Sequence, residues 1–189
     1  MRTIQQTIYK YNELSTKAQK YALEKWQRNF DFEPCLDVYI ERLKGLGFID
    51  PVIHYDLSFS QGSGSCFDAE INLETIFNSD KIGKRLKRIC LWYKKAYNED
   101  PIYIVKNSWA NHYCHEKTRS IEHVFGSNRP ILKKLFKFAE NFITDFYRIE
   151  CKSIHKSLED DFLDQQSEES FKEACEANEW EFYDDGSLV

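Results

Sequence analysis

The segment from Ile53 to Leu73 carries the strongest structural pattern in the chain, because polarity alternates on both sides of a glycine- and serine-rich window, FSQGSGSCF. Apolar side chains occupy every second position before and after this window: Ile53, Tyr55, Leu57 and Phe59, then Phe67, Ala69, Ile71 and Leu73. Alternation with a period of two is typical of a strand with one buried face. Two such strands joined by a short Gly/Ser segment predict an antiparallel hairpin.

Apolar residues three or four positions apart predict helices elsewhere in the chain. The expected helices cover 15–30, about 33–44, 81–97, a long segment that starts near Pro130 and can extend past Ile154, and a short acidic segment within 167–180. Ser15 is expected to cap the first helix, and Ser167 or Ser170 the last. Further strands are expected at 2–11, 101–109 and 119–125, with a short strand or extended tail at 181–186. This order predicts an α+β fold, with several amphipathic helices packed on an antiparallel sheet.

Charge divides the chain into two parts. Residues 1–158 hold 25 Lys/Arg and 19 Asp/Glu, a net charge of +6, whereas residues 159–189 hold 1 Lys and 12 Asp/Glu, a net charge of −11. We therefore expect an α+β body at 1–158 and an acidic C-terminal helical segment at 159–189. Such a segment either folds onto a basic surface of its own chain or faces a basic partner.

The chain shows no sign of export or of membrane insertion. No apolar run approaches the roughly 20 residues that span a bilayer, and the polar N-terminus lacks the apolar region of a signal peptide. Six cysteines are scattered without a CxxC pair, which indicates reduced thiols where no export signal is present. We expect a cytoplasmic protein with no membrane partner.

The Gly/Ser window does not match known phosphate-binding loops. A P-loop needs a lysine and a following helix, and a dinucleotide-binding loop opens a helix as well. The window has no lysine and leads into a predicted strand. Cys66 as a nucleophile would need a neighbouring base, for which His54 across the hairpin is the candidate. A turn whose serines bond the local backbone is the favoured interpretation.

The segment HYCHE holds metal-ligand residue types, namely His112, Cys114 and His115, with His123 further on. Structural zinc sites bring their ligands in pairs, and the sequence offers no second pair. Adjacent carboxylates such as Asp160 and Asp161 do not face each other on a helix. We therefore assign no catalytic residue, no metal and no cofactor, and expect a protein that is not an enzyme.

The stretch KIGKRLKRICLWYKK is the most basic in the chain. Its charges lie opposite the apolar face of the predicted helix, and like charges four residues apart repel each other. A nucleic-acid backbone, the acidic tail of the chain or solvent alone could offset that repulsion. The candidate contact residues, which include an aromatic side chain for base stacking and three lysines of the later helix, are Lys81, Lys84, Arg85, Lys87, Arg88, Trp92, Lys94, Lys95, Lys133, Lys134 and Lys137. The candidate acidic surface comprises Asp160, Asp161, Asp164, Glu168, Glu169 and Glu173.

Three segments resemble a known family in their order and spacing. They are YKYNELSTKAQKYALEKW, GFIDPVIHYDLSFSQGSGSCF and EACEANEWEFYDDG, which together run from about residue 9 to 186. They are similar to a family of small phage- and prophage-encoded proteins that carry the label "antitoxin of toxin–antitoxin stability system". The chain departs from the family pattern at Ser58, where the family has glycine, at Ser63, where it has aspartate, and at Tyr183, where it has threonine.

The resemblance implies a phage accessory protein in a bacterial host cell. The function we expect is a non-enzymatic inhibitor of bacterial immunity of the anti-CRISPR type, which binds a host CRISPR effector protein, its guide RNA, or both, through charged surfaces. An antitoxin-like module that neutralises a cognate toxin is the first alternative. A metal-dependent hydrolase built around His112, Cys114 and His115 is the second.

Overall fold

The computed structural model describes residues 6–60, 62–72, 87–88, 91, 102–107, 113–123 and 130–189. The chain forms two compact units. The central unit is Cys35–Leu158, and the terminal unit combines Met1–Pro34 with Glu159–Val189. Four α-helices and a four-stranded antiparallel sheet in these residues confirm the α+β class.

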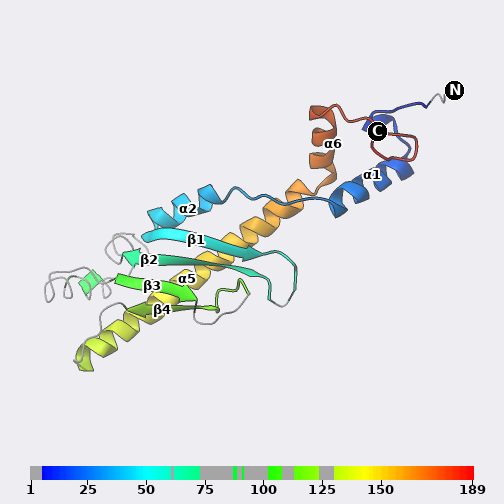
Figure 1. Ribbon diagram of the computed structural model, residues 1–189. Helices are drawn as coiled ribbons and strands as arrows, with labels where there is room; N and C mark the ends of the chain where they lie inside the picture. The colour runs from blue at the N-terminus through cyan, green and yellow to red at the C-terminus, as the bar shows by residue number, and fades with distance from the viewer. Residues whose placement is uncertain are drawn as a thin grey trace. The chain divides into compact units, whose positions relative to one another are not determined.

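The sheet of the central unit has the strand order β1-β2-β3-β4, with β1 at Phe48–Asp56, β2 at Gly64–Asn72, β3 at Ile102–Asn107 and β4 at Arg119–His123. Figure 1 shows the four strands side by side. The predicted hairpin is confirmed, because β1 and β2 pair antiparallel with Ile53 opposite Phe67 and Asp56 opposite Gly64. The strands predicted near 101–109 and 119–125 correspond to β3 and β4.

The hairpin loop lies earlier in the sequence than predicted, between Asp56 at the end of β1 and Gly64 at the start of β2. Leu57 and Phe59 were expected in the first strand, but β1 ends at Asp56, and Phe59 is exposed with a positive φ of 55°. The Asp56 carboxylate accepts a hydrogen bond from Ser58 N (2.8 Å), and Ser63 Oγ accepts one from Ser60 N (2.9 Å). Such side-chain bonds compete with strand pairing, which explains why β1 ends at Asp56 although the alternation of polarity continues beyond it.

Two helices of the central unit pack beside and behind this sheet. α5 extends over Pro130–Gln165, in agreement with a long helix that continues past Ile154, and it crosses behind the strands in the view of Figure 1. Buried residues of the sheet meet buried residues of α5: the Phe67 ring lies 4.6 Å from the Tyr147 ring, between centroids. α2 at Leu36–Gly45 buries Leu43, and its Arg42 pairs with the buried carboxylate of Glu150 in α5.

The terminal unit joins the two ends of the chain through α1 at Thr16–Arg28 and α6 at Glu168–Ala177. Ser15 caps α1 as predicted, accepting from Ala18 N at 3.3 Å. Ser167, rather than Ser170, caps α6, and it accepts from Ser170 N at 3.1 Å. The core of this unit consists of Tyr11, Leu14, Ala18, Ala22, Phe171, Cys175 and Phe182.

The strand predicted at 2–11 is wrong for its described part, residues 6–11. Pairing is limited there to a single bridge between Tyr9 and Phe182, and a 3-10 turn follows at Tyr11–Glu13. The Glu13 carboxylate accepts a hydrogen bond from Lys10 N at 2.7 Å, which favours the turn over an extended chain. Phe182 also bridges Leu188, so the end of the chain is extended as expected.

The division into units differs from the expected division at 158/159. The acidic segment does begin a new unit at Glu159, but residues 1–34 belong with it instead of with the body. The predicted basic helix at 81–97 lies mostly outside the described residues; Lys87, Arg88 and Leu91 are described and helical.

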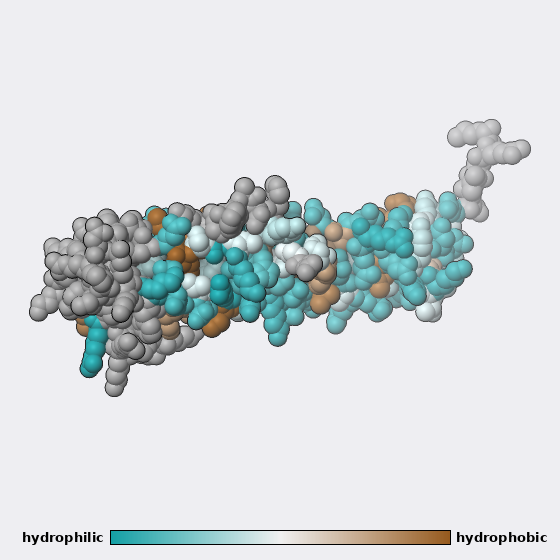
Figure 2. Space-filling view, turned by 90° about the horizontal axis from the view of Figure 1, so that it is seen from below, coloured by the Kyte–Doolittle hydropathy of each residue, from teal (hydrophilic) through white to brown (hydrophobic). Residues whose placement is uncertain are grey.

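One face of the molecule is seen in Figure 2. On the face seen in Figure 2, hydrophilic residues predominate and hydrophobic ones form small separate patches. In the part of the chain that the structure describes, we find no helix with the length and apolar character required to cross a bilayer.

Candidate partner-binding surfaces

The structure brings together the Gly/Ser window and the HYCHE segment, two motifs far apart in the sequence. A Cβ atom added to Gly64 would lie 2.6 Å from the backbone oxygen of Cys114, and one added to Gly62 would lie 2.4 Å from the ring of Tyr113. Both distances are shorter than van der Waals contact, so the two glycines allow residues 113–115 to pack directly on the start of β2. The window is therefore a packing surface within the central unit.

Cys66 does not have the environment of a nucleophile. It is fully buried, and burial raises the pKa of its thiol to about 11. His54 lies opposite Cys66 on β1, but its Nε2 is 3.1 Å from Asp68 Oδ2, and Asp68 also accepts a hydrogen bond from Arg119 Nε at 2.5 Å. These contacts direct His54 to a carboxylate, and the protonated thiol remains inert.

The described part of HYCHE forms a charged contact that includes α5. Glu116 is buried; its carboxylate lies 3.0 Å from His115 Nδ1 and 3.9 Å from Lys152 Nζ. Cys114 is partly buried, and burial raises the pKa of its thiol. Among the described residues, no three His, Cys, Asp or Glu side chains converge as a metal site would require. His112 lies outside the described residues, as does the side chain of His123.

The predicted acidic surface lies in the terminal unit, at the end of α5 and along α6. All six of its side chains are exposed: Asp160, Asp161, Asp164, Glu168, Glu169 and Glu173. Lys172 is the single basic residue in 159–189, and it pairs with Glu168 at 2.6 Å. Glu168 and Glu169 occupy the first turn of α6, where the helix dipole favours negative charge. We call these six residues the acidic surface.

The predicted basic residues are described only in part. Arg88 is exposed and Lys87 half-buried, whereas Lys81, Lys84, Arg85, Trp92, Lys94 and Lys95 lie outside the described residues. Lys133 and Lys134 lie in α5, and their side chains are outside the described part of the chain. Lys137 is exposed and pairs with Glu140 at 2.5 Å, one helical turn later.

Net charge differs in sign between the two units. The terminal unit, residues 1–34 with 159–189, holds 7 Lys/Arg and 16 Asp/Glu, a net charge of −9. The central unit, residues 35–158, holds 19 Lys/Arg and 15 Asp/Glu, a net charge of +4. The six cations contributed by residues 1–34 therefore leave the terminal unit strongly acidic.

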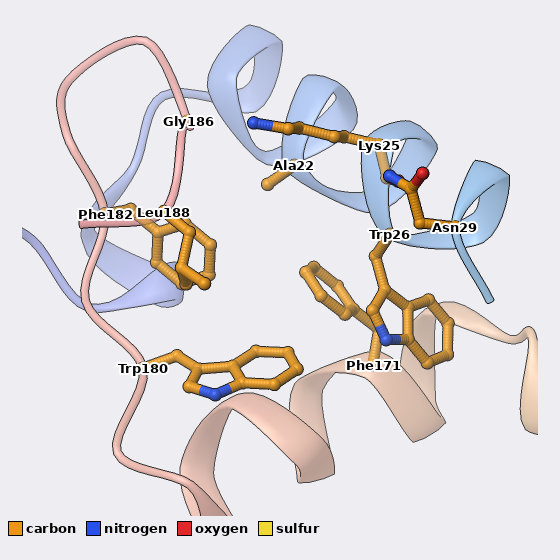
Figure 3. A pocket seen from close by; sticks show the side chains of 9 residues that line it. All are labelled: Ala22, Lys25, Trp26, Asn29, Phe171, Trp180, Phe182, Gly186 and Leu188. Atoms are coloured by element: carbon orange, nitrogen blue, oxygen red, sulfur yellow. The ribbon is translucent and has the colours of Figure 1, made fainter. Parts of the chain in front are cut away.

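Sequence reasoning missed an aromatic cavity in the terminal unit, shown in Figure 3. It measures about 210 Å³ and is lined by Ala22, Lys25, Trp26, Asn29, Phe171, Trp180, Phe182, Gly186 and Leu188. The density of aromatic residues between 171 and 182 was the one available signal. The second wall comes from α1, about 145 residues earlier in the sequence, and local periodicity carries no information about that pairing.

Comparison with known proteins identifies a family but no activity. Residues 32–168 match the family described as a domain of unknown function, DUF8835. All residues that line the aromatic cavity lie outside this range. No curated protein matches the chain, and no solved structure does. Because the match extends over more than half of its length, the chain belongs to the DUF8835 family.

Proposed function

We propose that this protein is a non-enzymatic, phage-derived inhibitor of bacterial immunity, of the anti-CRISPR type, which acts in the cytoplasm of the host cell by binding a CRISPR effector. The observation that carries the proposal is the acidic surface of the terminal unit: six exposed carboxylates with a single lysine among them. The sequence resemblance to phage-encoded proteins supplies the biological context.

The proposed target of the acidic surface is a basic channel that normally holds nucleic acid. Such channels attract negative charge over distances near the Debye length, about 8–10 Å at physiological salt. A folded array of carboxylates resembles a row of phosphates, and α5 and α6 already order the backbone that carries it. Electrostatic complementarity of this kind mainly raises the association rate and selects the partner.

The basic residues provide a second contact in this proposal. Arg88 is exposed and Lys87 is half-buried, and they stand in the most basic stretch of the sequence. Lysine and arginine side chains bind phosphate backbones and make the affinity depend on salt. We propose that this stretch contacts the guide RNA of the effector while the acidic surface occupies the channel.

Two triplets of isosteric substitutions test the acidic surface. One changes Asp160, Asp161 and Asp164 to Asn, and the other changes Glu168, Glu169 and Glu173 to Gln. Both remove the negative charges and keep the size of the side chains. The matched control changes the exposed carboxylates Asp37, Asp50 and Glu70 of the central unit to their amides. The measurement is the affinity of each variant for purified effector–guide complexes, at several salt concentrations.

Each acidic triplet should weaken binding by about tenfold or more and flatten its salt dependence. The control triplet should leave both unchanged. Equal losses for all three triplets would contradict a role for this surface, since only general charge would then matter. Copurification with a small host toxin, together with no effect on any CRISPR effector, would replace the proposal by the antitoxin alternative.

A further inference from the structure

The aromatic cavity of the terminal unit has the form of a small-molecule site. Three segments build it: α1 contributes Ala22, Lys25, Trp26 and Asn29, α6 contributes Phe171, and the C-terminal residues contribute Trp180, Phe182, Gly186 and Leu188. Figure 3 shows the aromatic side chains arranged around the space, with Lys25 extending along its upper side. None of the six residues of the acidic surface lines this cavity, so a ligand here would be independent of the proposed function.

The size and the walls of the cavity suit an aromatic ring. An apolar cavity of about 150 Å³ is large enough to bind benzene, and this one measures about 210 Å³. Phe171 stands between two indoles: its ring centroid lies 5.0 Å from that of Trp26 and 6.2 Å from that of Trp180. Flat aromatic walls favour a flat ligand, through offset or edge-to-face ring contacts.

One charged group lines the cavity, and it is a cation. Lys25 is exposed and makes no ion pair within 4.0 Å in the part of the chain described. Its charge lies near enough to Asp185 to help lower the pKa of that carboxyl, after the hydrogen bonds from Ser187. Both hydrogen bonds that Asp185 Oδ1 accepts come from Ser187. Since the Lys25 ammonium pairs with no carboxylate among the described residues, its donors are available to an anion in the cavity.

We propose that the cavity binds an aromatic carboxylate of one or two rings, with the ring between Trp26, Phe171 and Trp180 and the carboxylate at the ammonium of Lys25. Burial of a ring in an apolar cavity supplies most of the affinity, and the charged hydrogen bond orients the ligand.

A cationic ligand is the physical competitor. Indole faces attract cations, and the terminal unit as a whole is acidic, with a net charge of −9. The position of Lys25 argues against that ligand, because a like charge at the wall costs more at contact distance than screened carboxylates elsewhere provide.

Three probes of equal ring size separate these possibilities: indole, indole-3-propionate and tryptamine, which are neutral, anionic and cationic at pH 7. The measurement is calorimetric titration of the full chain, with ligand-observed NMR for weak binding. Indole-3-propionate should bind about tenfold more tightly than tryptamine, with indole between them. Failure of all three to bind below about 1 mM, or tightest binding of tryptamine, would overturn the proposal.

Two variants locate the binding in the cavity. Lys25→Met keeps the aliphatic stem and removes the charge, so it should abolish the preference for the acid; Lys20→Met, on the same helix but outside the cavity, should not. Ala22→Met places extra atoms in the cavity and should weaken all three probes at least tenfold, whereas Ala177→Met at the exposed end of α6 should have no effect. The proposal would also be overturned if Lys25→Met and Ala22→Met both bound the three probes as tightly as the wild-type chain and kept its preference for indole-3-propionate. Lys25 is exposed, so Lys25→Met keeps the test valid if Ala22→Met does not fold.

Discussion

The hydroxyl group of Tyr147 in α5 satisfies both backbone hydrogen-bonding groups of Phe67 in β2, accepting from Phe67 N and donating to Phe67 O, each at 3.0 Å. Pairing between β2 and β3 covers only Ala69–Asn72 and does not reach Phe67. Buried backbone groups without a partner are costly. A single helix side chain therefore replaces the strand pairing at this point.

Tyr147→Phe should lower the free energy of unfolding by about 2–3 kcal/mol, because it leaves a buried N–H and a buried C=O without a partner. Urea unfolding followed by circular dichroism measures the change. The matched control is Tyr21→Phe, since Tyr21 is 48% exposed and should change stability by less than about 0.5 kcal/mol. Similar losses in both variants would show that the hydroxyl of Tyr147 has no special role.

Gly64→Ala should destabilise the protein more than Gly62→Ala. The new Cβ at Gly64 would meet the backbone oxygen of Cys114, which cannot move without shifting the chain, and a loss of about 2–4 kcal/mol is expected. The Cβ at Gly62 would meet the ring of Tyr113, which is 59% exposed and free to rotate away. Thermal unfolding of the two variants checks the order, and the reverse order would contradict the packing of residues 113–115 on β2.

Gly186→Ala should destabilise the protein, whereas Gly45→Ala should stabilise it. Gly186 has a φ of +87°, and a Cβ there would lie 2.2 Å from the backbone oxygen of Ala18. Gly45 ends α2 with open space around it, so alanine there should add about 0.5–1 kcal/mol through helix propensity. Urea midpoints that shift in the same direction for both variants would contradict this account.

Stability should fall as the pH rises above about 9, because three buried thiols stay protonated in the folded protein. Burial raises the pKa of Cys66 and Cys175 to about 11 and that of Cys151 to about 12, from an ordinary value of 9.0. Between pH 9 and the pKa of each folded thiol, the unfolded chain has lost protons that the folded chain keeps. Raising the pH in this range therefore lowers the free energy of unfolding. The contribution of the three thiols to stability is fully present below pH 9, and it is lost as the pH rises through the pKa values of the folded protein.

Urea unfolding at pH 8, 9 and 10 measures this loss, and a serine variant isolates one thiol. Cys66→Ser should give a shallower decline than the wild-type chain, because serine does not titrate in this range. The exposed Cys35 provides the control, since Cys35→Ser should leave the decline unchanged. Equal slopes for all three proteins would contradict the buried, protonated state of Cys66.

Local patterns in the sequence determined the secondary structure well where backbone geometry alone decides it. The period of two around the Gly/Ser window predicted β1 and β2, because alternate side chains of a strand point to opposite faces. Ser15 was predicted as the cap of α1, and Ser167 as one of two candidates for the cap of α6, because a side-chain oxygen satisfies backbone N–H groups only a few residues away. The exposure of the acidic surface was likewise predictable, since carboxylates with only one lysine nearby are too poorly paired to be buried.

Tertiary structure alone decided which of these segments meet. Residues 1–34 were expected in the body, but Tyr11, Ala18 and Ala22 pack with Phe171 and Phe182 from the other end of the chain. The aromatic cavity and the bond from Tyr147 to Phe67 arise from similar long-range contacts. Periodicity shows which side chains a segment will bury, but the partner depends on shape, volume and unsatisfied backbone groups contributed by residues far away in the sequence.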